Sequence, residues 1–194
     1  MKLFARPSAG AIIRAMRQPG QFALTAFLLL AGCADGIEIG AMDQRPAYDP
    51  SLVQYITRNG TLGVVVRGAP FGVSGDDPAP VLAAMSAPGW LGNVRLVPGQ
   101  DSGRGYRIVL IFGPGAGEPC ALPPTLPATS GEAGLHVQAS FCAGRQVLST
   151  LVGSSPPVHG ADDPRFRQLL DQVIANLLPP YNRDRIRSED GAGM

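Results

Sequence analysis

Residues 164–178 carry an apolar stripe with the spacing of a helix that buries one face. The apolar side chains recur at i, i+3, i+4, i+7 and onward, and they are Phe166, Leu169, Leu170, Val173, Ile174, Leu177 and Leu178. Polar residues occupy the opposite side. Pro179-Pro180 ends the pattern, because proline cannot continue a helix. The stripe therefore predicts a helix over 164–178 that packs on the protein's own sheet, with docking on a partner or a membrane as the alternative.

The dipeptide Asp-Pro precedes this helix and two other segments with helical spacing. It occurs at Asp49-Pro50, Asp77-Pro78 and Asp163-Pro164. Aspartate at an N-cap accepts hydrogen bonds from the first backbone amides of a helix. Proline suits the first helical position because it has no amide to satisfy. We therefore expect two further helices, near residues 50–58 and 78–86.

Five segments have the composition of β-strands. They are Thr61–Arg67, Val94–Val97, Tyr106–Phe112, Leu135–Ala143 and Gln146–Val152. The first and third are apolar on both faces, as in central strands, while the fourth alternates between apolar and polar positions. Gly144-Arg145 can form a two-residue turn, which predicts a tight hairpin. The expected fold is α+β, with a single, mostly antiparallel sheet of about five strands packed with two or three helices in the order α-β-α-β-β-β-β-α.

The amino terminus has the layout of a secretory signal. Its basic residues are Lys2, Arg6, Arg14 and Arg17, and no acid precedes Asp35. An uncharged apolar run follows over Phe22–Leu30, and a basic region before such a run is typical of secretory signals. The run is too short for a membrane-spanning helix, which needs about 20 apolar residues. The sequence leaves open whether translation starts at Met1 or Met16.

The four residues Leu30-Ala31-Gly32-Cys33 close this segment. They resemble the lipobox of bacterial lipoproteins, in which a leucine, two small residues and a cysteine form the signal-peptidase site. The resemblance implies cleavage before Cys33, lipid on its sulfur and a stable membrane anchor. Ala34, rather than aspartate, follows the cysteine, and in such lipoproteins this favours the outer membrane, facing the periplasm. An ordinary secretory signal or an anchor helix with a chance cysteine is the alternative.

This interpretation divides the chain into four parts. Residues 1–32 are the signal peptide, 33–48 the lipidated cysteine and a tether, 49–180 one globular α+β domain, and 181–194 a flexible tail. The leader holds four of the 16 basic residues and none of the 15 acids, so the remainder has a net charge of about −3. Nucleic-acid-binding proteins carry concentrated positive charge, so we expect no nucleic-acid partner.

Cys120 and Cys142 are the two cysteines outside the lipobox. In an exported protein an even pair indicates a disulfide, which would add roughly 3 kcal/mol in the chain-entropy model. The connection at 113–134 is rich in glycine and proline and contains Cys120, so the bond would pin it to the edge of the strand at 135–143. Long connections are usually functional or disordered, and this one is our first candidate contact surface.

The common catalytic and metal-binding arrangements are not recognisable in this sequence. His136 and Cys142 lie on one face of the same predicted strand, roughly 20 Å apart, so they cannot share a proton. His136 and His159 do not have the spacing of zinc ligands. Helix capping explains the acidic pairs Asp76-Asp77 and Asp162-Asp163 better than calcium binding does. We therefore expect no enzymatic activity, no cofactor and no metal.

Two functions remain open at this point. The leading hypothesis is a non-catalytic, membrane-anchored lipoprotein that binds another envelope protein as an assembly module. The alternative is an accessory lipoprotein of an envelope transport system that binds lipid or cell-wall fragments. It would need an apolar pocket between the sheet and the helix at 164–178. Trp90, the single tryptophan, either closes the end of the core or anchors a partner or a glycan.

Overall fold

The computed structural model describes residues 36–68, 70–71, 77–100, 102–113, 118–121 and 134–182. The signal peptide, Cys33, Asp76 and most of the connection at 113–134 lie outside these ranges, as do the residues after Asn182.

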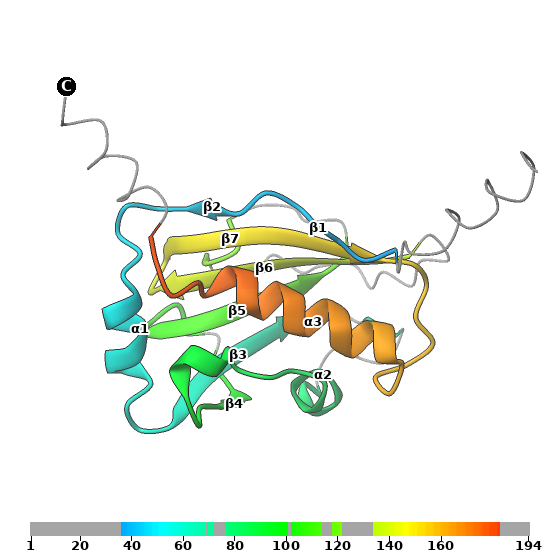
Figure 1. Cartoon of the computed structure of the whole chain (residues 1–194), viewed down its shortest axis with the longest axis horizontal. Coiled ribbons are helices and arrows are strands. Elements are labelled where there is room, and N and C mark those ends of the chain that lie inside the picture. The colour runs from blue at the N-terminus through cyan, green and yellow to red at the C-terminus, as the bar shows by residue number, and fades with distance from the viewer. Residues whose placement is uncertain are drawn as a thin grey trace, which may run out of the picture. The chain divides into compact units, whose positions relative to one another are not determined.

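A single mixed sheet forms the centre of the described structure (Figure 1). Its seven strands are β1 (Glu38–Ile39), β2 (Asp43–Gln44), β3 (Thr61–Arg67), β4 (Arg95–Pro98), β5 (Tyr106–Phe112), β6 (Leu135–Ala143) and β7 (Gln146–Ser155). They follow the spatial order β1-β7-β6-β5-β3-β4, and β2 also pairs with β7. β3 runs parallel to β4 and β5, whereas the other pairs are antiparallel.

The α+β class is confirmed, and the finer description of the sheet is matched only roughly. The sequence predicted about five mostly antiparallel strands. Four of the six strand pairings are antiparallel, but β3 pairs in parallel with β4 and β5, and the sheet has two additional strands of two residues each. The connection between β3 and β4 contains a helix and returns the chain to the end of the sheet where β3 begins. Such a crossover makes consecutive strands parallel, and strand composition alone does not reveal it.

The helices are α1 (Pro50–Ile56), α2 (Ala79–Ala83) and α3 (Pro164–Leu177), with a 3-10 turn at Gly89–Leu91. Asp49, Asp77 and Asp163 each accept a 2.9 Å hydrogen bond from the backbone amide two residues later. α1 and α3 begin at the proline as predicted, whereas α2 begins one residue later, at Ala79, with Pro78 as its N-cap. α2 ends three residues before the predicted position. There the amides of Ala84 and Met85 bond to carbonyls three residues back, which tightens the last turn.

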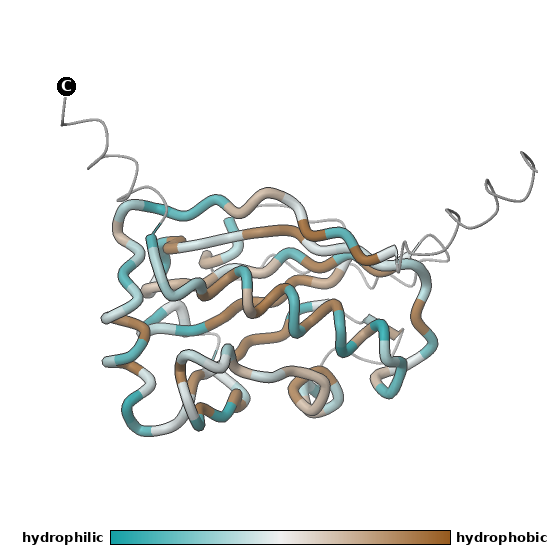
Figure 2. Tube along the Cα trace, viewed as in Figure 1, coloured by the Kyte–Doolittle hydropathy of each residue, from teal (hydrophilic) through white to brown (hydrophobic). Residues whose placement is uncertain are grey.

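The apolar stripe of α3 packs on one face of the sheet, which we call the helix face. All six stripe residues within α3 are fully buried, namely Phe166, Leu169, Leu170, Val173, Ile174 and Leu177. They belong to one core cluster with apolar residues of β3, β5, β6 and β7. Figure 2 shows the corresponding apolar colouring along α3 and the strands that it crosses. The predicted packing of this helix on the protein's own sheet is therefore confirmed.

Gly153 on β7 allows α3 to approach the sheet closely. A Cβ atom at this position would lie 2.7 Å from Cγ2 of Val173 and 3.0 Å from Cδ1 of Leu169. Atoms of protein interiors are close-packed, so neither side chain can retreat without opening a gap elsewhere. A side chain at position 153 would therefore push α3 away from β7.

Part of the segment expected to be a tether, residues 33–48, belongs to the sheet. β1 pairs Glu38 with Ser154, and β2 pairs Asp43 with Thr150. Between these pairs the amide of Gly40 donates a 2.7 Å hydrogen bond to the carbonyl oxygen of Val152. Backbone hydrogen bonds of this kind leave little trace in the side-chain pattern. The fold thus begins before the predicted boundary at residue 49, and residues 38–44 cover the outer edge of β7.

The two ends of the folded segment meet at Tyr48. Its side chain is fully buried, and its hydroxyl donates a 2.7 Å hydrogen bond to the carbonyl oxygen of Pro179. Asn182, which the sequence placed in the flexible tail, is also buried and donates a 2.8 Å hydrogen bond to the carbonyl oxygen of Tyr48. The chain after α3 is therefore fixed as far as Asn182, two residues beyond the predicted end of the domain.

Candidate functional site

The side of the sheet opposite α3 carries a second, smaller apolar cluster, and we call this side the loop face. Its cluster consists of Val65, Val109, Ile111, Cys120 and Cys142, with Val147 at its margin. Cys120 comes from the segment 118–121, the described part of the predicted contact region. The other members come from the strands β3, β5, β6 and β7.

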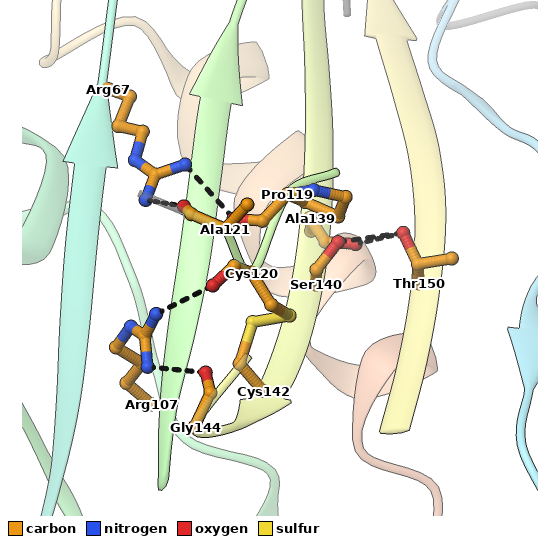
Figure 3. The surroundings of a disulfide bond; sticks show 10 residues. All are labelled: Arg67, Arg107, Pro119, Cys120, Ala121, Ala139, Ser140, Cys142, Gly144 and Thr150. Carbon is orange, nitrogen blue, oxygen red and sulfur yellow. Dashed lines mark hydrogen bonds between the residues drawn. A yellow bond between two sulfur atoms is a disulfide. The ribbon is translucent and has the colours of Figure 1, made fainter. Parts of the chain in front are cut away.

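Cys120 and Cys142 form the disulfide predicted from the sequence (Figure 3). Their Cα atoms are 5.6 Å apart, and both residues are fully buried. The sequence predicted that this bond would pin the segment to the edge of the strand at 135–143, and this detail was wrong. β6 has a neighbouring strand on both sides, β5 and β7, so segment 118–121 is fixed over the face of a central strand. This correction follows from the strand order, which the sequence did not reveal.

Two buried arginines hold the same segment by its backbone (Figure 3). Arg67 on β3 donates hydrogen bonds of 3.0 and 2.9 Å to the carbonyl oxygens of Pro119 and Ala121. Arg107 on β5 donates a 3.1 Å hydrogen bond to the carbonyl oxygen of Cys120. Their exposed fractions are only 7% and 2%. A guanidinium stays charged in proteins, and each hydrogen bond to a charged group contributes about 1.5–3 kcal/mol net.

Arg107 also joins segment 118–121 to the hairpin between β6 and β7. Its second terminal nitrogen donates a 2.9 Å hydrogen bond to the carbonyl oxygen of Gly144, at the hairpin turn. Sequence reasoning missed Arg67 and Arg107. The signal was present, because each is a charged residue on a strand that is otherwise almost entirely apolar. A charge in such a strand indicates a polar partner lying over the sheet.

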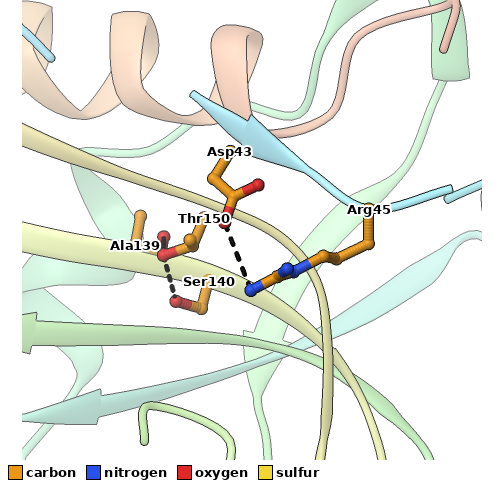
Figure 4. A network of polar contacts seen from close by, with 5 residues as sticks. All are labelled: Asp43, Arg45, Ala139, Ser140 and Thr150. Atoms are coloured by element: carbon orange, nitrogen blue, oxygen red, sulfur yellow. Dashed lines mark hydrogen bonds and ion pairs between the residues drawn. The ribbon is translucent and has the colours of Figure 1, made fainter. Parts of the chain in front are cut away.

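Towards β7 the loop face becomes polar (Figure 4). The hydroxyls of Ser140 and Thr150 are 2.8 Å apart, and Thr150 also donates a 3.0 Å hydrogen bond to the carbonyl oxygen of Ala139. Beside them Asp43 and Arg45 form a 3.3 Å ion pair, with both side chains more than half exposed. An exposed pair of this kind contributes little to stability.

The titratable residues singled out in the sequence do not form a cluster. Cys142 is in the disulfide, and His136 is exposed on the loop face. Asp163 caps α3, and hydrogen bonds from the backbone amides of Arg165 and His159 hold the pKa of its carboxyl below the usual range, the first being the larger cause. In the part of the chain that the structure describes, no three His, Cys, Asp or Glu residues lie close enough to hold a metal ion.

Two open hollows lie at the end of the sheet where β3, β5 and β7 begin. The larger, of about 500 Å³, is lined by Arg45, Pro46, Ala47, Glu118, Arg145, Gln146 and Val147. The smaller, of about 360 Å³, is lined by Gln54, Thr57, Arg58, Gly60, Trp90, Leu91, Asn93 and Val94. Segment 118–121 therefore contributes Glu118 to the larger hollow, beside two arginines from distant parts of the sequence.

Trp90 lines the smaller hollow and also closes one end of the core. It is partly buried against the main apolar cluster, and its indole nitrogen donates a 2.9 Å hydrogen bond to the carbonyl oxygen of Leu178. This satisfies the polar atom of the side chain within the protein. The predicted core-closing role of Trp90 is therefore confirmed.

The space between the sheet and α3 is filled by side chains. The inner face of α3 is fully buried, as are Ile108, Leu110, Val137, Ala139 and Phe141 on the strands beneath it. A lipid carrier would need an apolar cavity here. Among the described residues this region is a packed core instead.

Comparisons with known proteins return no relative: the chain matches no protein-family model, no curated protein and no solved structure. No helix in the described ranges is both long and apolar enough to span a membrane.

Proposed function

We propose that this protein is a lipid-anchored lipoprotein of the cell envelope that binds another envelope protein and catalyses no reaction. Lipid on Cys33 attaches it to a membrane. Because Ala34, rather than aspartate, follows the cysteine, this membrane is the outer membrane, and the protein faces the periplasm. The support for anchoring is the basic leader, its short apolar run and the lipobox-like sequence that ends at Cys33.

The observation that carries the binding role is the way segment 118–121 is fixed. A buried disulfide and three hydrogen bonds from two buried guanidiniums hold four residues on the loop face. Their partners on the segment are backbone carbonyls, so they fix the path of the chain. A rigid backbone lowers the conformational entropy lost when a partner binds. This arrangement supports protein recognition more than chemistry on a small substrate.

The experiment is chemical crosslinking in intact cells, followed by purification of the lipidated protein and mass spectrometry of what accompanies it. We expect one dominant envelope protein. In a second variant a glycine-serine linker of equal length replaces residues 122–133, while segment 118–121 is retained. This variant tests whether residues 122–133 contribute to binding of the partner. Lipid or glycan as the main co-purifying species, with no protein, would contradict the proposal and favour the carrier.

A further inference from the structure

Exposed arginines gather at one end of the sheet, where β3, β4, β5 and β7 begin and β6 ends. They are Arg45, Arg58, Arg95, Arg104 and Arg145, and we call this region the arginine end. They come from five separate segments between residues 45 and 145. The chain outside the leader has a net charge of about −3, so this concentration of positive charge is local.

Four of these arginines have no carboxylate partner within the described ranges. Arg45 forms an ion pair with Asp43, but Arg58, Arg95, Arg104 and Arg145 form none with a described residue. At the arginine end Asp43, Asp49 and Glu118 lie among the five arginines. At the opposite end Glu38, Asp162 and Asp163 lie with the exposed Arg165 and Arg167. Among these residues arginines are therefore in excess at one end of the sheet and acids at the other.

Exposed tyrosines accompany the arginines. Among the described residues four large apolar side chains are exposed, and three of them, Tyr55, Tyr106 and Tyr181, are at the arginine end, with exposed fractions of 60%, 41% and 44%. The guanidinium of Arg58 lies 4.5 Å from the centre of the Tyr55 ring. Tyrosine and arginine are the residue types that contribute most to binding at protein interfaces, together with tryptophan.

The arginine end rests on a packed aromatic group. The Tyr106 ring stacks on Phe141, and the buried Tyr48 meets Phe141 edge-on, with ring centres 6.3 Å apart in both pairs. Arg107 and the disulfide fix the neighbouring hairpin and segment 118–121. The exposed arginines and tyrosines therefore lie on well-packed, fixed neighbours, which lowers the conformational entropy lost on binding.

β1, the first described strand, lies at the other end of the sheet. β1 pairs with the last residues of β7, and Glu38 follows Cys33 by only five residues, about 18 Å of fully extended chain. From Ser154, the partner of Glu38, to Gln146 at the arginine end, β7 spans eight residues or roughly 26 Å. A lipid on Cys33, which is part of the proposed function, would thus be attached near the end opposite the arginines.

From this arrangement we infer that the arginine end is the surface that binds the protein partner, and that the partner presents an acidic face. Guanidinium groups recognise carboxylates with paired hydrogen bonds, and the tyrosines provide contact area at a small entropic cost. The inference rests on the proposed function and specifies its surface and the chemistry of the partner.

Site-specific photocrosslinking in intact cells tests the location of the surface. A photoreactive phenylalanine analogue replaces Tyr55 or Tyr181 in the full chain, and Val152 as the control. Val152 is 50% exposed but lies on the loop face. We expect the first two positions to form an adduct with a protein segment rich in aspartate and glutamate, and position 152 to form little or none. Adducts with phospholipid in place of protein would overturn the inference and assign the arginines to a membrane surface.

Charge reversal tests the chemistry. The double variant Arg58→Glu/Arg145→Glu should lower the yield of the protein adduct by about tenfold, since charge complementarity governs association. The matched control, Arg165→Glu/Arg167→Glu, reverses two exposed arginines on α3 and should leave the yield within about twofold, because exposed charges beyond a Debye length act weakly. An equal loss of adduct yield in both double variants, or no loss in either, would overturn the inference.

The two proposals fail in different ways. If chemical crosslinking of the wild-type chain recovers no protein, the proposed function and the inference are both wrong. If it recovers a protein, but crosslinks from Val152 exceed those from Tyr55 and Tyr181, the protein binds a partner through another surface and only the inference is wrong.

Discussion

Arg107 donates a hydrogen bond to the carbonyl oxygen of Cys120, the residue whose sulfur is bonded to Cys142. The guanidinium and the disulfide therefore hold the same residue from two directions, one through its backbone and one through its side chain. Because Arg107 also bonds to Gly144, it links the loop face to the hairpin at the arginine end.

Replacement of Arg107 by methionine should lower the free energy of unfolding by about 2–4 kcal/mol, because the carbonyls of Cys120 and Gly144 lose a charged donor. Urea denaturation monitored by circular dichroism measures the change. Arg165→Met, at an exposed position, is the control and should change stability by less than about 0.5 kcal/mol. Equal stability of Arg107→Met and the wild type would show that the buried guanidinium does not support the loop.

Loss of the disulfide should also destabilise the fold. The double variant Cys120→Ala/Cys142→Ala should lose roughly 3 kcal/mol, since the bond closes a loop of 22 residues. Urea denaturation with and without a reducing agent provides the measurement. The reducing agent should destabilise the wild type and leave the double variant unaffected. A wild type that is insensitive to complete reduction would argue against a stabilising bond.

Substitution at Gly153 should separate α3 from the sheet. Gly153→Val should cost about 1–3 kcal/mol, because the new side chain would overlap Val173. Gly160→Ala is a suitable control, since a Cβ there meets no atom within 4 Å. A Val173→Ala change combined with Gly153→Ala should recover part of the stability lost in Gly153→Ala alone. Additive losses in thermal denaturation would contradict the proposed contact.

Stability should decrease at alkaline pH through Tyr48. Burial, and then the charge of Asp49, raise the pKa of the Tyr48 hydroxyl. A group whose pKa is higher in the folded state contributes fully below its unfolded pKa, about 10 for tyrosine, and its contribution is lost as the pH rises above that value. Urea denaturation between about pH 8 and pH 11 should show a steeper decline for the wild type than for Tyr48→Phe. Parallel declines would exclude Tyr48 as the cause.

The elements with strong local patterns were predictable from the sequence. The helix face of α3 follows directly from the spacing of Phe166, Leu169 and Val173, and the hairpin follows from strand alternation and the turn at Gly144. Such patterns depend only on neighbouring residues. The disulfide was predictable for a different reason, because Cys120 and Cys142 have a single possible pairing if Cys33 carries lipid, as proposed.

The parallel pairing of β3 and the two short strands β1 and β2 were not predictable in the same way. Glu38 and Asp43 join the sheet through backbone hydrogen bonds to β7, and no local pattern specifies that partner. The arginine end was not predictable for the same reason. Arg45 and Arg145 line one hollow although they are 100 residues apart in the sequence, so only the assembled fold brings them together.

In the proposed function, lipid on Cys33 attaches this folded unit to a membrane. Intact-mass spectrometry of the protein extracted from membranes, together with metabolic labelling by a palmitate analogue, tests this attachment. We expect a chain that begins at Cys33 and carries acyl chains, with labelling abolished in Cys33→Ser. A mature chain that begins elsewhere, or labelling of Cys33→Ser at the wild-type level, would contradict it.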